Sequence, residues 1–156
     1  GKGSTFNVYF PVDKTFFVEN KANANSIIQG GTGKILFIDD EQGILEMGEQ
    51  MLVRLGYQVT AYASSTKALD LFRSDPGGFD LVITDMAMPK MTGDKLSGEI
   101  LRIRPDIPIL LCTGFSETLS EEKAEQLGIK GFLMKPIVMK DLAKKIRNVL
   151  ENKNIR

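Results

Sequence analysis

The sequence predicts an α/β fold, a doubly wound parallel sheet of five strands flanked by five helices. From Lys34 onward, short apolar runs alternate with longer segments whose apolar residues recur at helical spacing. The runs at 35–38 and 81–83 are continuously apolar, which is typical of strands covered on both faces. Strand and helix units that alternate with right-handed connections build a parallel sheet between two helical layers.

The individual elements follow from these patterns in chain order. The expected strands span 35–38, 57–62, 81–83, 108–112 and 131–134. The expected helices span 42–55, the segment between Ser64 or Ser65 and Pro76, about 96–103, 116–127 and 138–152. The first helix is expected to face the sheet with Ile44, Met47, Met51, Leu52 and Leu55.

Length and composition are typical of one ordinary domain without a strong charge. The chain has 156 residues, with 20 basic and 20 acidic side chains. We therefore expect no nucleic-acid partner and no membrane contact for this stretch, whose apolar runs are too short to span a bilayer. The lone Cys112 and the lack of a signal-peptide pattern favour the cytoplasm. Histidine is absent, which excludes a histidine base, metal ligand or phosphohistidine within the chain.

Polar side chains follow four of the expected strands, at the sheet edge where ligands usually bind. Each of them alone could be an ordinary turn or surface residue. Their convergence on one edge favours a functional site instead. The strand ends carry Asp39, Asp40 and Glu41, then Asp85, then Thr113 and Gly114, and finally Lys135 and Pro136.

The residue types at these strand ends indicate phosphoryl chemistry. Three carboxylates in one pocket repel one another and need a cation, and oxygen ligands suit Mg²⁺, so Asp39, Asp40 and Asp85 are candidate magnesium ligands. A carboxylate beside Mg²⁺ can attack phosphorus, which makes Asp85 the candidate nucleophile for an aspartyl phosphate. Lys135 would neutralise charge on the transferred group, and the Thr113 hydroxyl would bond to it.

Residues 34–153 resemble a receiver domain, the response-regulator module of two-component signalling. The acid pair, the stretch D-M-A-M-P-K-M-T-G at 85–93, the Thr113-Gly114 pair and the Lys135-Pro136 pair match in order and spacing. The resemblance implies the flavodoxin-like receiver fold with strand order 2-1-3-4-5. It also implies a phospho-accepting domain of a Mg²⁺-dependent phosphorelay, which switches a protein-interaction surface.

The resemblance further implies how the acidic pocket is used. Asp85 is the phosphoacceptor, and it takes part in its own phosphorylation and dephosphorylation. Asp40 and Asp85 bind Mg²⁺ directly, and Asp39 binds it through water. The backbone carbonyl of Ala87 completes the protein ligands. The small Ala87 side chain leaves the lifetime of the phosphoryl group open.

The same resemblance implies a phosphoryl grip and a switch. Thr113 and Lys135 hold the phosphoryl group as catalytic partners of Asp85. Phe132 is the switch aromatic, which turns inward when Thr113 moves toward the phosphate. The peptide bond before Pro136 is expected to be cis.

The first residues do not belong to this pattern. Residues 1–12 contain G-x-G-S-T-F-x-V-x-F-P, which resembles the last glycine box and final strand of histidine-kinase ATP-binding domains, and 13–33 indicate a linker. The chain is then expected to be the C-terminal receiver of a hybrid sensor histidine kinase, whose parent could be membrane-anchored. The donor would be a phosphohistidine on its own kinase core or on a His-containing phosphotransfer protein. Since no output domain follows Arg156, the output is expected to be protein contact or further transfer.

Three other functions are compatible with parts of the pattern. A receiver-like binding module that does not use phosphate would keep the fold without the chemistry. A phosphatase of the haloacid dehalogenase type also uses an Asp nucleophile, but it needs D-x-D where this chain has adjacent Asp39 and Asp40. A flavodoxin-like FMN carrier needs a Gly/Ser/Thr phosphate loop after the first strand, where this chain has acids. The oligomeric state stays open.

Overall fold

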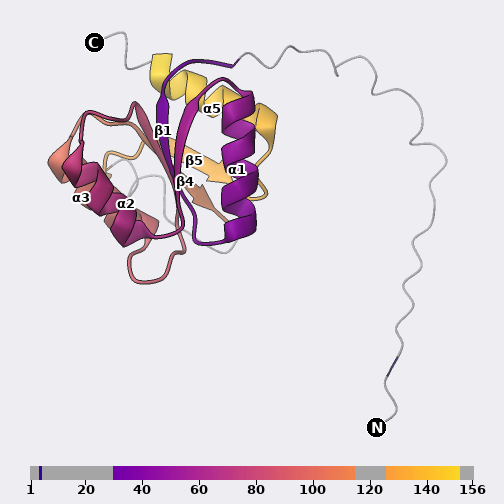
Figure 1. The fold of residues 1–156 in the computed structure, drawn as a ribbon, viewed down its shortest axis with the longest axis horizontal. Coiled ribbons are helices and arrows are strands. Elements are labelled where there is room, and N and C mark those ends of the chain that lie inside the picture. Colours follow the sequence, from indigo (N-terminus) through magenta and orange to yellow (C-terminus); the bar gives the residue numbers. More distant parts are fainter. Residues whose placement is uncertain (1–3, 5–29, 115–125, 152–156) are drawn as a thin grey trace.

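In the computed structural model, which describes residue 4 and residues 30–114 and 126–151, strands and helices alternate along the chain (Figure 1). The strands are β1 (Lys34–Ile38), β2 (Gln58–Tyr62), β3 (Leu81–Asp85), β4 (Ile109–Thr113) and β5 (Gly131–Met134). The helices in these ranges are α1 (Gln42–Arg54), α2 (Ser65–Ser74), α3 (Gly93–Ile103) and α5 (Met139–Glu151). The helix expected over 116–127 lies outside the described residues apart from its last two positions, as does the stretch expected over 1–12 apart from residue 4. None of the described helices is long and apolar enough to cross a bilayer.

The five strands form one parallel sheet in the order β2-β1-β3-β4-β5, which confirms the predicted doubly wound fold. All four neighbouring pairs run parallel. Every residue of β3 and β4 is buried, and so are the last four residues of β1. Continuously apolar strands are expected in this position, because helices cover both faces of a parallel sheet.

Two helical layers enclose the sheet. Figure 1 shows α1 and α5 on one side of it and α2 and α3 on the other. Alternate side chains of β1 enter different cores: Ile35 and Phe37 pack with α1 and α5, whereas Leu36 and Ile38 pack with α2 and α3. The strands that carry the candidate site residues are therefore fixed from both faces.

The predicted core face of helix α1 is confirmed for Ile44, Met51, Leu52 and Leu55, which pack on the core, and is wrong at Met47. Its buried residues are Leu45, Gly48 and Leu52, whereas Met47, which was expected to face the sheet, is 38% exposed. The reason is the buried ring of Phe37, which lies so close to Gly48 that a side chain there would overlap it. The helix therefore packs on the strand with Gly48, and the neighbouring Met47 faces the surface.

The last residues of the predicted linker pack on the domain. The backbone N–H of Gly31 donates a hydrogen bond of 2.9 Å to the carbonyl oxygen of Leu55, at the end of α1. A Cβ at Gly30 would overlap the backbone carbonyl group of Leu55. The chain therefore approaches β1 along a path that requires glycine.

The contact between Gly48 and Phe37 predicts that Gly48→Ala destabilises the domain, although alanine favours helices. We expect a loss of about 1–3 kcal/mol in the free energy of unfolding, the usual cost of overpacking a core. Gly98→Ala in α3 is the matched control, since a Cβ there meets nothing within 4 Å. It should gain about 0.5–1 kcal/mol through helix propensity. Urea denaturation measures both changes, and equal stabilisation by the two variants would contradict the close contact.

The position of Cys112 in β4 predicts an unreactive thiol. Cys112 is fully buried, and burial, with a contribution from the charge of Asp85, raises the pKa of its thiol to about 12. The native protein should not react with a chromogenic thiol reagent at mildly alkaline pH, whereas the protein unfolded in guanidinium should react at one thiol per chain. Above the ordinary pKa of 9.0 the unfolded thiol ionises first, so this group lowers stability as the pH rises. Rapid labelling of the native protein would show that β4 is accessible.

Candidate functional site

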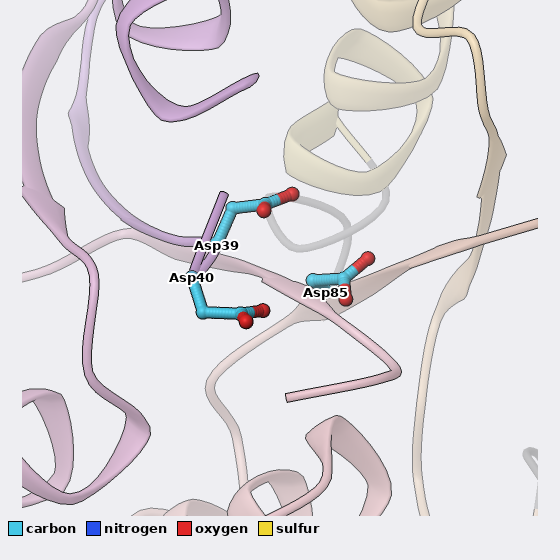
Figure 2. A group of neighbouring side chains, drawn as sticks. All are labelled: Asp39, Asp40 and Asp85. Atoms are coloured by element: carbon cyan, nitrogen blue, oxygen red, sulfur yellow. The ribbon is translucent and has the colours of Figure 1, made fainter. Parts of the chain in front are cut away.

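The register of the sheet brings Asp39 and Asp85 side by side. Ile38 lies opposite Thr84 in the β1–β3 pair, so the next residues, Asp39 and Asp85, are at the same level. Asp40 follows directly, and one carboxylate oxygen from each of the three acids lies within 4.8 Å of the other two. Figure 2 shows the three side chains next to one another. The structure therefore brings together all three acids that the sequence predicts as magnesium ligands.

Two of the three acids are buried and held by the backbone. Asp39 is 0% exposed and Asp85 is 4% exposed, whereas Asp40 is more accessible. Asp39 Oδ1 accepts a hydrogen bond of 3.0 Å from the backbone N–H of Glu41. Asp85 Oδ2 accepts one of 2.9 Å from the backbone N–H of Ala87. The turn after each strand therefore orients the carboxylate at the end of that strand.

Lys135 enters the same pocket from the end of β5. Its Nζ lies 2.9 Å from Asp39 Oδ2 and 2.5 Å from Asp85 Oδ1. Its backbone N–H donates a 2.9 Å hydrogen bond to the carbonyl oxygen of Thr113, and the Lys135–Pro136 peptide bond is cis, as the resemblance implies. The Lys135 side chain is 19% exposed, so water screens these ion pairs less than pairs on the surface.

Burial and charge act in opposite directions on the pKa values in the pocket. Burial raises the pKa of Asp39 above its ordinary 3.8, and the neighbouring ammonium of Lys135 opposes this only in part. Burial would lower the pKa of Lys135, but its bonds to Asp85 and Asp39 outweigh burial and raise it. Lys135 therefore keeps its charge at neutral pH. Because the folded-state pKa of Asp39 is raised, its ionisation destabilises the fold, and the contribution of this group to stability is lost as the pH rises above 3.8.

The pocket suits a hard divalent cation. Asp39 Oδ2 is buried and accepts no aligned hydrogen bond within the described part of the chain, because its contact with Lys135 is an ion pair without that alignment. All the side-chain ligands available from Asp39, Asp40 and Asp85 are oxygens, which Mg²⁺ prefers. These residues can therefore hold such an ion.

The remaining residues with expected roles lie around this pocket. Thr113 is the last residue of β4, is buried, and donates a hydroxyl hydrogen bond of 3.1 Å to the carbonyl oxygen of Gly114. Phe132 in β5 is partly buried and packs against Leu111 and Ile129. Thr113 therefore stands at the same sheet edge as the acids, whereas Phe132 packs into a small apolar cluster beside it.

Glu41 also belongs to this edge, although the sequence patterns assigned it no role. Its side chain is 67% exposed, and its Oε1 lies 3.9 Å from Lys135 Nζ. The sequence did contain a signal, because Glu41 extends the acid pair to a run of three. That signal could not reveal the partner, since Lys135 follows the last strand of the sheet, far away in the sequence.

Comparisons with known proteins agree with this geometry. A model of the response regulator receiver domain matches residues 35–147. The sensor kinase CckA of Brucella abortus (strain 2308) is 28% identical over 99% of this chain and 17% of the kinase. The two-component response regulator ARR11 of Arabidopsis thaliana is 36% identical over 77% of this chain and 23% of that protein. The chain therefore spans less than a quarter of the length of these two relatives.

Solved structures show the same fold. A response regulator receiver domain protein from Clostridium thermocellum has a TM-score of 0.74 at 35% identity, over 78% of this chain and 97% of that one. The chemotaxis protein CheY4 of Vibrio cholerae has a TM-score of 0.69 at 30% identity, over 77% of this chain and 100% of that one. Because the family model covers most of the chain and the sheet order and acid pocket agree with it, the chain belongs to the response regulator receiver domain family.

Proposed function

We propose that Asp85 of this receiver domain accepts a phosphoryl group from a phosphohistidine in a Mg²⁺-dependent phosphorelay. The observation that carries the proposal is the Lys135 ammonium, which lies within ion-pair distance of both Asp85 and Asp39. It places a fixed positive charge beside the one buried acid that ends the central strand. Receiver domains take phosphoryl groups from histidine kinases or phosphotransfer proteins, which supports the same donor class here.

In the proposed step, a carboxylate oxygen of Asp85 attacks phosphorus in line with the phosphorus–nitrogen bond of the donor. A phosphorus–oxygen bond forms as the phosphorus–nitrogen bond breaks, and the leaving imidazole keeps the electron pair and takes up a proton from water. The backbone N–H of Ala87 and the ammonium of Lys135 hold the Asp85 carboxylate in place beforehand. Lys135 also faces the negative charge on the transferred oxygens.

The proposed magnesium ligands follow from the pocket and the family resemblance. Asp40 and Asp85 would bind the ion directly, Asp39 through water, and the backbone carbonyl of Ala87 would complete the set. Asp39 suits the outer position because one of its oxygens already faces Lys135 and the other accepts a backbone hydrogen bond. When bound, the ion neutralises charge on the phosphoryl oxygens.

The response to phosphorylation is proposed to run through Thr113 and Phe132. The Thr113 hydroxyl, which now donates to a backbone carbonyl, would turn to bond a phosphoryl oxygen. Phe132 would then turn inward and shift the population of states at the surface formed by β5 and α5. Phe132 has no hydroxyl group, so its outward position cannot be held by a phenolic hydrogen bond. The expected output is contact with another protein or further transfer.

The proposed parent is a hybrid sensor histidine kinase that presents its receiver in the cytoplasm. In this proposal residues 1–12 end its ATP-binding domain, 13–33 form the linker and 34–153 form the receiver. The similarity to a sensor kinase supports this division because it extends over 99% of the chain, and so beyond the receiver itself. The sequence upstream in the full-length protein tests it: a dimerisation helix with a histidine and the remaining ATP-site motifs should be present.

The assignment of Asp85 predicts that Asp85→Asn abolishes Mg²⁺-dependent phosphoryl uptake from acetyl phosphate, because an amide cannot supply the attacking oxygen. Intact-protein mass spectrometry measures the fraction of chains that carry one phosphoryl group. Asp70→Asn, at an exposed acid of α2, is the control and should label like the native chain. The chain has no histidine, so the label cannot sit on an imidazole. Labelling of Asp85→Asn would contradict the assignment, and no labelling of the native chain would favour a phosphate-independent binding module.

The excess of carboxylates over ammonium groups in the pocket predicts that Asp40→Asn stabilises the metal-free domain. Relief of repulsion from Asp39 and Asp85 should add on the order of 1 kcal/mol to the free energy of unfolding in EDTA. Mg²⁺ at ten times its dissociation constant should add about 1.4 kcal/mol to the native chain and much less to the variant. Thermal unfolding with and without Mg²⁺ measures both effects, with Asp70→Asn as the control. An Asp40→Asn protein that is less stable in EDTA, or equally stabilised by Mg²⁺, would contradict the pocket as described.

A further inference from the structure

We propose that Glu41 selects the phosphoryl donor by its charge: its carboxylate, held at the mouth of the pocket beside Lys135, slows reaction with small dianionic donors. This inference rests on the proposed function, because it assigns a residue to the phosphoryl transfer at Asp85. Glu41 is a specificity-determining residue here and takes no part in bond making.

The backbone fixes Glu41 at this place. Its N–H donates a 3.0 Å hydrogen bond to Asp39 Oδ1, inside the pocket. Its carbonyl oxygen accepts a 2.9 Å hydrogen bond from the backbone N–H of Leu45, in the first turn of α1. Glu41 is also the N-cap residue of that helix, in an extended conformation. The side chain therefore starts from a fixed point at the rim, whichever rotamer it adopts.

The Glu41 side chain is exposed and lies near the ammonium that the donor must approach. It is 67% exposed, and its Oε1 lies 3.9 Å from Lys135 Nζ. Asp39 and Asp85 are closer to the same ammonium, at 2.9 Å and 2.5 Å. Lys135 is therefore already shared by two buried acids, and little of its charge is left to balance the third. An incoming anion meets Glu41 as a negative charge at the rim.

The size of this effect depends on the charge of the donor. At a separation of several ångströms in water-like surroundings, repulsion between one carboxylate and a dianion is about twice that for a monoanion. Acetyl phosphate is a dianion near neutral pH, whereas phosphoramidate is a monoanion. Removing the Glu41 charge should therefore raise the rate of phosphorylation by acetyl phosphate roughly three- to tenfold, and the rate of phosphorylation by phosphoramidate only about two- to threefold. High salt should bring the variant and the native chain together, because salt screens exposed charges.

The experiment compares Glu41→Gln with the native chain at low and high salt, using acetyl phosphate and phosphoramidate as donors in the presence of Mg²⁺. Glu46→Gln is the matched control, since Glu46 is an exposed acid of the same helix that accepts a hydrogen bond from the Gln42 side chain. Glu41→Asp keeps the negative charge near the rim, so its labelling by acetyl phosphate should stay as slow as that of the native chain. The chain contains no tryptophan, so intact-protein mass spectrometry follows the labelled fraction with time.

We expect Glu41→Gln to raise the labelling rate more with acetyl phosphate than with phosphoramidate. This difference from the native chain should disappear at high salt. Three results would overturn the inference: unchanged rates, a gain of equal size with both donors, or a gain that salt does not reduce. An equal gain would indicate a change in the helix end instead of a charge effect. If the native chain labels at Asp85 and Glu41→Gln behaves like it, only the role of Glu41 is lost. If the native chain does not label, or Asp85→Asn still does, the proposed function itself fails.

Discussion

The ion pairs of Lys135 with Asp39 and Asp85 are the interaction on which the rest of this structure depends. Two buried carboxylates without a counter-charge would cost several kcal/mol, because charges are poorly solvated inside a protein. Lys135 supplies that counter-charge from the end of β5, the outermost strand of the sheet. The same ammonium leaves the pocket with more negative than positive charge, which suits a divalent cation. Lys135 therefore contributes both to the stability of the fold and to the proposed chemistry, so a substitution at Lys135 should affect both.

The sheet and its two cores hold this arrangement in place. Helices cover both faces of β1 and β3, so their carboxyl ends cannot shift relative to each other without opening a core. The backbone N–H groups of Glu41 and Ala87 then orient the two buried carboxylates. The contact between Gly48 and Phe37 also supports the site, because it lets α1 approach β1, the strand that Asp39 follows. The first helix begins directly after the acids, so its position also sets the rim of the pocket.

Much of the fold was predictable because its signals are local. Continuous apolar runs identified four of the strands and an alternating segment identified β2, and the polar residues after the four apolar runs identified the edge that carries the site. The buried face of α1 was predicted wrongly at Met47, since periodicity cannot show that a neighbouring phenylalanine ring needs a glycine at Gly48. The helix expected over 116–127 lies outside the described residues apart from its end. The assigned roles of Thr113, Phe132 and Ala87 stay predictions, because they concern a conformational change and metal coordination.

By itself the sequence determined which kinds of side chain follow each strand, and therefore the class of fold and the acidic character of its edge. These properties depend on neighbouring residues and on periodicity, which a linear chain contains in full. Only the tertiary structure decided that Lys135 shares its charge between Asp39 and Asp85 and that Glu41 stands next to it. The physical reason is that such pairing depends on strand register and side-chain reach between residues far apart in the chain, and no local pattern encodes either.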